Sequence, residues 1–241
     1  MISMVFGRSF RFREGFFILY FCLMPCCDLV LTAQESAWTS AADIPQARGF
    51  TSGAAVDDQI YIIGGFNENH ASTATVQMFD PADGSWIRKS DMPEARCAQA
   101  VCTWNRKIYV FGGVSPDAFS TAGSNVFVYD PESVSWTEKK SMPFSNAFCG
   151  IAVVQDTIYL IGGMTSFNAA PVSHTLAYCP VTDSFFLKKE MPFPRGWLPV
   201  CSLEGQIYAI GGSYPDPENP SHALRPAAVL VYDLNSDACE Q

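Results

Sequence analysis

Four polar side chains recur at nearly equal intervals along the chain, and three of them are arginines. Arg48, Arg96, Asn146 and Arg195 follow one another at steps of 48, 50 and 49 residues. A guanidinium presents a rigid fork of donors that matches a carboxylate, so converging arginines could hold an acidic group. The alternative is that residues repeated this regularly belong to the framework and donate to local backbone carbonyls. Both interpretations require a fold that gathers the repeats around one centre.

Metal chemistry has weak support in the sequence. The chain has three histidines, His70, His174 and His222. Three converging imidazoles could hold a metal ion. The segments that carry them share no register, so we expect ordinary solvent-exposed histidines, no metal and no cofactor.

Six cysteines lie beyond residue 33, and no two of them form a Cys-x-x-Cys pair. They are Cys97, Cys102, Cys149, Cys179, Cys201 and Cys239. An even number permits disulfides in an oxidising compartment. Their place in or beside apolar segments favours small buried side chains instead.

Catalytic motifs are equally hard to find. The carboxylates Asp57, Asp58, Asp83, Asp91 and Glu94 fall at turn positions, where Asp is expected for local hydrogen bonding. The sequence has no Gly-x-Ser-x-Gly elbow, no phosphate loop and no His-Glu-x-x-His segment. Hydrolase and nucleotide chemistry therefore lack a visible site, and we expect a protein that is not an enzyme.

The elements that must position these residues form a repeat built on Ile-Tyr-x-x-Gly-Gly. Its Tyr and Gly residues are Tyr61, Gly64, Gly65, Tyr109, Gly112, Gly113, Tyr159, Gly162, Gly163, Tyr208, Gly211 and Gly212. Repetition at this period predicts an array of similar units. A glycine pair at a strand end permits positive φ and close backbone approach, so we expect a framework role for it.

The sequence pattern of each unit predicts short β-strands and no helix. In the second unit we expect strands at residues 98–104, 107–111, 125–129 and 135–138, with a tight turn at Asn105 and Arg106. Four antiparallel strands per unit leave two sheet faces exposed. Such a sheet buries both faces only by stacking on its neighbours, which explains why the units come as an array.

The combined motif resembles the kelch repeat. Arg lies thirteen residues before the Tyr of Tyr-x-x-Gly-Gly, and a variable loop, an aromatic residue followed by Asp-Pro, and then Trp and Met-Pro come after it, with Trp86 and Trp136 at the Trp position. The resemblance covers residue 38 to about residue 235 and implies an all-β, kelch-type β-propeller. Its four recognisable four-stranded blades would be units at about 41–90, 91–140, 141–189 and 190–241, in a domain over 34–241.

Four blades are fewer than the kelch resemblance implies, so we expect an incomplete or open ring. The alternative is a compact four-bladed ring, with residues 37–40 as a strand that closes the last blade. An open ring would leave the flat faces of its first and last blades unpaired, which predicts self-association.

Function is expected on the face that carries the variable loops at 66–75, 114–124, 164–174 and 213–227. The Pro-x-x-Arg connections should emerge on the same face, and loops on a rigid frame commonly carry binding. The resemblance implies that Arg48, Arg96, Asn146 and Arg195 line a basin for acidic peptide. Phe148 and Trp197, each two residues beyond such a position, could add an aromatic rim with Phe50, Phe144 and Phe193.

The first 33 residues have the order of a secretory signal peptide. Three arginines precede an apolar run at 15–24, and Thr32 and Ala33 follow it. We therefore expect a secreted or periplasmic protein, with an uncleaved membrane anchor in residues 15–33 as the alternative. The formal net charge of −9 disfavours nucleic acid as a partner, because phosphate contacts need clustered Lys and Arg.

These observations favour a non-catalytic propeller that binds a protein segment or glycan on its loop face. A secreted or periplasmic sugar-modifying enzyme, such as a sialic acid mutarotase, is the alternative, with Glu94 or His70 beside the arginines as its candidate groups. An intracellular adaptor or actin binder is disfavoured, since only about 37 residues precede Trp38.

Overall fold

The computed structural model of the 241-residue chain describes residues 38–115, 121–216, 223–225 and 227–234. The predicted signal or anchor at 1–33, His222 and Cys239 lie outside these residues. Within the described ranges, no helix is long and apolar enough to cross a membrane. The blades all lie within residues 41–241.

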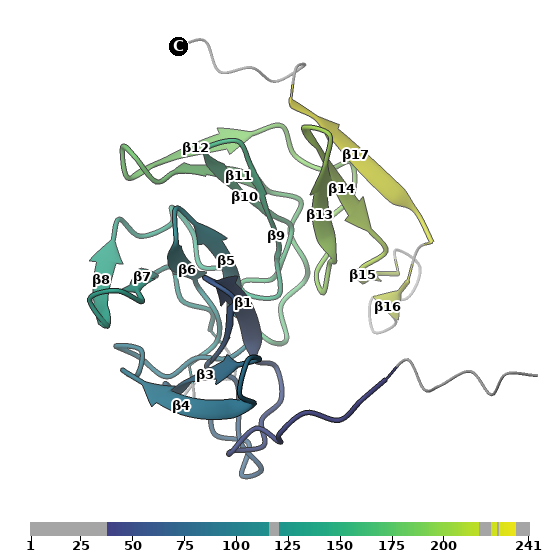
Figure 1. Cartoon of the computed structure of the whole chain (residues 1–241). Coiled ribbons are helices and arrows are strands. Elements are labelled where there is room, and N and C mark those ends of the chain that lie inside the picture. Colours follow the sequence, from purple (N-terminus) through teal and green to yellow (C-terminus); the bar gives the residue numbers. More distant parts are fainter. Residues whose placement is uncertain (1–37, 116–120, 217–222, 226, 235–241) are drawn as a thin grey trace, which may run out of the picture. The chain divides into compact units, whose positions relative to one another are not determined.

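Antiparallel sheets follow one another in chain order, as Figure 1 shows. Blade 1 contains β1 (Ser52–Val56), β2 (Gln59–Ile63), β3 (Val76–Asp80) and β4 (Ser85–Lys89). Blade 2 contains β5 (Ala100–Trp104), β6 (Lys107–Phe111), β7 (Val126–Asp130) and β8 (Ser135–Lys139). Blade 3 contains β9 (Gly150–Val154), β10 (Thr157–Ile161), β11 (Thr175–Cys179) and β12 (Ser184–Lys188).

Blade 4 is smaller in the described part of the chain. It contains β13 (Val200–Leu203), β14 (Gln206–Ile210) and β17 (Val229–Asp233), and a separate two-stranded ribbon of β15 (Tyr214–Pro215) and β16 (Ala223–Leu224) lies in its loop. The innermost strands β1, β5, β9 and β13 contact one another in that order. The all-β propeller with four blades in an open ring is therefore confirmed.

Several details differ from the sequence-based expectation, and in blade 2 the third and fourth strands span 126–130 and 135–139 rather than 125–129 and 135–138. Residues 38–40 form no strand, which disagrees with the alternative in which residues 37–40 close the last blade. The first strand of blade 2 begins at Ala100 rather than Ala98, because Ala98 has a φ of 55°. A left-handed residue cannot continue the extended backbone of a strand.

Tight turns join the first two strands of each blade. In blade 2 the turn residues Asn105 and Arg106 have φ values of 47° and 60°. In blade 1 Asp57 and Asp58 have values of 48° and 63°. Positive φ at both central residues is the geometry whose twist matches that of an antiparallel hairpin.

The glycine pairs link each blade to the next through one backbone carbonyl. The amide of the second glycine donates to the carbonyl of the polar residue at the repeated Arg position in the following blade. The three bonds are Gly65 N to Arg96 O at 2.9 Å, Gly113 N to Asn146 O at 2.9 Å and Gly163 N to Arg195 O at 2.8 Å. We call these bonds the interblade carbonyl contacts.

The first glycine of each pair is required by the same carbonyl. A Cβ added at Gly64 would lie 2.5 Å from Arg96 O, one at Gly112 would lie 2.1 Å from Asn146 O, and one at Gly162 would lie 2.3 Å from Arg195 O. These glycines also have positive φ, between 57° and 64°. The first glycine is therefore explained by a close approach of the next blade, whereas a Cβ at the second glycine would meet its own blade, as at Gly65, where Gly49 O would lie 2.7 Å away.

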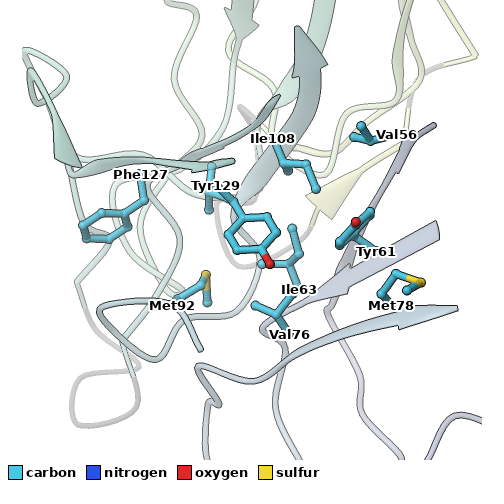
Figure 2. Close-up of a cluster of buried hydrophobic side chains, with 10 residues drawn as sticks. Val56, Tyr61, Ile63, Val76, Met78, Met92, Ile108, Phe127 and Tyr129 are labelled. Atoms are coloured by element: carbon cyan, nitrogen blue, oxygen red, sulfur yellow. The ribbon is translucent and has the colours of Figure 1, made fainter. Parts of the chain in front are cut away.

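The core consists of side chains packed between neighbouring blades. Between blades 1 and 2, Tyr61, Ile63 and Val76 meet Ile108 and Tyr129 in one buried cluster (Figure 2). Similar clusters join blade 2 to blade 3 and blade 3 to blade 4. Each blade is thus stabilised mainly by its neighbours, as expected for a repeat array.

The tryptophans of the outer strands add a polar link along the array. Trp136 packs on Tyr129 and its indole N–H donates to Ser90 O of the preceding blade at 3.0 Å. Trp86 packs on Phe79 and donates to Ala42 O at 2.9 Å. The segment before blade 1 thus provides the acceptor that a preceding blade provides elsewhere.

Replacing the first glycine of a pair tests the interblade carbonyl contacts. We expect Gly84→Ala to cost about 1–2 kcal/mol, because Gly84 has a φ of 73° but a Cβ there meets open space. Gly162→Ala carries the same φ penalty and adds a clash with Arg195 O, so it should cost at least about 2 kcal/mol more. Urea unfolding of the two variants measures the difference, and equal losses would show that the carbonyl contact is unimportant.

Candidate functional site

The repeated arginines are anchored inside their own blades. Arg195 is 1% exposed, and its Nη1 donates to Gly211 O at 3.0 Å and to Ala228 O at 3.2 Å. Arg48 makes the equivalent bonds in blade 1, to Gly64 O at 3.3 Å and Thr75 O at 3.0 Å. In both blades the guanidinium ties the first glycine of the pair to the segment that leads into the third strand.

Arg96 is also buried but has a carboxylate partner. Its Nη1 donates to Gly113 O at 3.4 Å, and its Nη2 donates to Asn125 Oδ1 at 2.9 Å and to Glu94. The side chain of Arg96 is 5% exposed, whereas that of Glu94 is 50% exposed. The pair therefore presents a carboxylate, and not a guanidinium, to solvent.

Asn146 occupies the same position in blade 3 and works in the same way. Its Nδ2 donates to Gly162 O at 2.9 Å, and the residue is 2% exposed. An amide can replace a guanidinium here because the feature common to the four blades is one side-chain donor to a carbonyl of the glycine pair, which belongs to the second glycine in blade 2 and to the first in the others. The framework interpretation explains all four side chains, and the basin for acidic peptide stays a prediction.

The structure gathers aromatic residues from three blades at the predicted loop face. Phe148 stacks on Trp197 with ring centroids 4.0 Å apart, and Phe50 lies 5.3 Å from Trp197 and 6.0 Å from Phe148. Phe66 stacks on Phe50 at 5.0 Å, and Phe167 lies 5.6 Å from Phe148. We call these five residues the central aromatic cluster.

A chain of backbone hydrogen bonds brings the cluster together. Ala98 N donates to Phe50 O, Phe148 N donates to Ala98 O, and Trp197 N donates to Phe148 O, each at 3.0 Å. These four residues have φ values of 47° to 55°. They lie two positions after the repeated Arg or Asn. The residues whose carbonyls accept hydrogen bonds from the glycine amides are therefore close in sequence to this chain of hydrogen bonds at the centre.

The cluster is partly buried and partly open. Phe148 is 8% exposed, while Phe50 and Trp197 are 41% and 40% exposed. Phe144, predicted as part of the rim, instead packs on His174 at 4.4 Å and against the core between blades 2 and 3. Phe193 is 55% exposed. The structure thus brings together Phe50, Phe148 and Trp197, and separates Phe144 from them.

The variable loops and the Pro-x-x-Arg connections lie side by side, as the sequence predicts. In each blade the residue after the repeated Arg or Asn pairs with the residue after the glycine pair. The four bridges are Gly49 with Phe66, Cys97 with Val114, Ala147 with Met164 and Gly196 with Ser213. The bridge with Gly49 places Phe66 in the central aromatic cluster. The position of Phe66 directly after Gly65 is the sequence signal that could have predicted its place in this cluster.

The titratable groups of the interior are shifted by burial. Burial raises the pKa of Tyr109 and of Tyr129 to about 12, and it raises the pKa of the Cys149 thiol to about 12. A hydrogen bond with Thr182 lowers the pKa of Cys179. Cys97, Cys102, Cys149, Cys179 and Cys201 are free thiols.

Residues able to bind a metal do not gather in the described part of the chain. No group of three or more His, Cys, Asp or Glu side chains there could hold a metal ion. His174 lies 3.7 Å from Glu190, measured from Nε2 to Oε1. The ring centroid of His70 lies 5.8 Å from that of Phe66, at the edge of the central aromatic cluster.

Comparison with known proteins agrees with this architecture. The family model described as the KLHDC2/KLHL20/DRC7 Kelch-repeats domain matches residues 25–212. The chain belongs to the kelch-repeat family. Among solved structures, the one titled "Structure of YjhT" is similar to this kelch protein with a TM-score of 0.73, 17% sequence identity, and coverage of 83% of this chain and 73% of that one. At that identity the likeness shows the fold alone. No curated protein matches the chain significantly.

Removing an arginine side chain distinguishes a framework role from a ligand-binding role. We expect Arg195→Ala to cost about 3 kcal/mol, because two carbonyl acceptors lose a charged donor and a buried space opens. Arg88→Ala is the control, since Arg88 is 62% exposed and pairs with Asp91 at the surface, and it should cost less than about 1 kcal/mol. Thermal unfolding measures both, and a melting temperature unchanged by Arg195→Ala would show that this side chain is free for a ligand.

Proposed function

We propose that this kelch protein is a non-catalytic binding module that captures a protein segment or glycan on its loop face, in a secreted or periplasmic setting. The central aromatic cluster is the contact surface. The observation that supports this is the convergence of Phe50, Phe148 and Trp197 from three blades, with two of the rings about 40% exposed.

The framework explains the backbone of these residues but not their side chains. The chain of backbone hydrogen bonds at the centre has positive φ at each of its four residues. Ala98 adopts this conformation with only a methyl side chain. Non-glycine residues in this conformation cost about 1–2 kcal/mol each, and large rings are unnecessary there. Exposed Phe and Trp at the same positions in blades 1 and 4 therefore support a role outside the framework.

The chemistry of the cluster suits a ligand with a flat or apolar group. A half-exposed indole beside a phenyl ring offers a wide surface at a low cost in side-chain entropy, and such residues dominate binding hot spots. The acidic chain, with a formal net charge of −9, disfavours a polyanionic ligand. A peptide with apolar side chains, or the apolar face of a sugar ring, meets both conditions.

One observation favours the alternative of a sugar-modifying enzyme such as a sialic acid mutarotase. Glu94 holds a half-exposed carboxylate against the buried guanidinium of Arg96, and a carboxylate beside an arginine is what the alternative requires. An NMR assay of sugar anomerisation distinguishes the two functions. The binding module predicts no acceleration over buffer, while an acceleration lost in Glu94→Gln would support the enzyme.

Truncation of the exposed rings tests the binding surface. Wild type is screened on an immobilised glycan array and a displayed peptide library, and its best ligand is then titrated against Trp197→Ala and Phe50→Ala. We expect each variant to bind at least about tenfold more weakly, because truncating an aromatic anchor typically costs about 2 kcal/mol.

Phe186→Ala is the matched control, because Phe186 is 47% exposed on β12, away from the cluster. It should bind as wild type does. If Trp197→Ala and Phe50→Ala also keep full affinity for that ligand while remaining folded, the central aromatic cluster is not the binding surface.

A further inference from the structure

Each blade has two faces with different residues, and neighbouring blades join unlike faces. We define the forward face by the positions of Tyr61, Ile63, Val76 and Met78 in blade 1, and the backward face by those of Ile108, Val110, Phe127 and Tyr129 in blade 2. These two sets share one buried cluster. The same pairing of forward face with backward face recurs between blades 2 and 3 and between blades 3 and 4.

The forward face of blade 4 is built like the others but is open in the described part of the chain. Ile210, Val229 and Val231 are 43%, 53% and 52% exposed. Their counterparts in blade 1, which are Ile63, Val76 and Met78, are 0%, 0% and 2% exposed. Three large apolar side chains on β14 and β17 therefore present half of an interblade interface to solvent.

Blade 1 presents the other half of that interface. Ile60 is 40% exposed, whereas its counterparts Ile108, Ile158 and Ile207 are each 0% exposed. The backward face of blade 1 is more polar than the others, because Gln77 stands in the place of Phe127 and accepts a hydrogen bond from Arg48 Nη2 at 2.5 Å. Gln77 is 5% exposed, so this part of the face is already covered, and the free part of the face lies around Ile60.

We propose that the forward face of blade 4 in one copy packs on the backward face of blade 1 in a second copy, head to tail. Both halves of an interface that the chain already forms three times lie on one molecule. Its four sheets do not close, so the two halves do not cover each other. The contact between Phe50 and Trp197 joins blades 1 and 4 at the centre, while Ile60 in blade 1 and Ile210, Val229 and Val231 in blade 4 stay exposed.

The internal interfaces also predict which residues meet across the two copies. Met78 and Ile108 lie in one cluster between blades 1 and 2. Val231 and Ile60 occupy the equivalent positions on the two free faces. The proposal therefore places Val231 of one copy and Ile60 of the other in the same apolar contact. Such a contact is heterologous, because it joins two different surfaces.

Sedimentation velocity of the full chain over a range of concentrations tests the proposal. Wild type should show reversible association that grows with concentration. Val231→Lys and Ile60→Lys should each weaken self-association at least about tenfold, since each buries an unpaired charge in the contact. Val181→Lys is the matched control: Val181 is 74% exposed in a turn of blade 3 and lies on neither face, so association should be unchanged. Circular dichroism melting checks that all variants remain folded.

Mixing the two interface variants identifies the geometry of the contact. The Ile60→Lys copy keeps an intact blade 4 face and the Val231→Lys copy keeps an intact blade 1 face, while the two substituted faces repel each other, so the mixture should form a one-to-one dimer and stop. A wild-type chain that stays monomeric at all concentrations overturns the proposal. So does an Ile60→Lys variant that self-associates as wild type does, because contact through blade 4 alone would then explain the assembly.

Discussion

The structure depends on one backbone carbonyl in each of blades 2, 3 and 4. The carbonyl oxygens of Arg96, Asn146 and Arg195 accept the amide of the second glycine in the preceding blade, at 2.8 to 2.9 Å. They approach the first glycine so closely that a Cβ there would lie 2.1 to 2.5 Å away. The contact fixes the spacing between sheets, which the apolar side chains then fill. It also fixes where the chain enters the next blade, and so where the centre of the propeller lies.

The side chains at the same three positions extend this constraint inward. Each donates to a glycine carbonyl of its own blade, so one residue bonds to the glycine pairs of two consecutive blades. Two residues later the chain adopts the left-handed conformation that links Phe50, Ala98, Phe148 and Trp197. The proposed binding surface is therefore a consequence of the framework geometry, combined with the choice of aromatic side chains at three of four equivalent positions.

The sequence predicted the framework well because its signals are local. Paired glycines, alternating apolar strands and two-residue turns each act within a few residues, and the structure confirms the strands, the turns and the positive φ of the glycines. The burial of Arg96 and Arg195 could not be predicted, because spacing does not say whether a guanidinium points at a carbonyl or at a ligand. The meeting of Phe50 with Trp197 was equally hidden, since it depends on how far the array turns between blades 1 and 4. The alternative of a closing strand rested on a Trp at the right spacing, and residues 38–40 form no strand.

Native-state hydrogen exchange, followed residue by residue by NMR, tests the central role of the interblade carbonyl contacts most directly. If these contacts hold the array together, the amides of Gly65, Gly113 and Gly163 should exchange only through global unfolding, as slowly as the amides of the buried strand β6. Exchange as fast as that of Asn69, whose amide bonds only to a side chain in an exposed loop, would contradict this account.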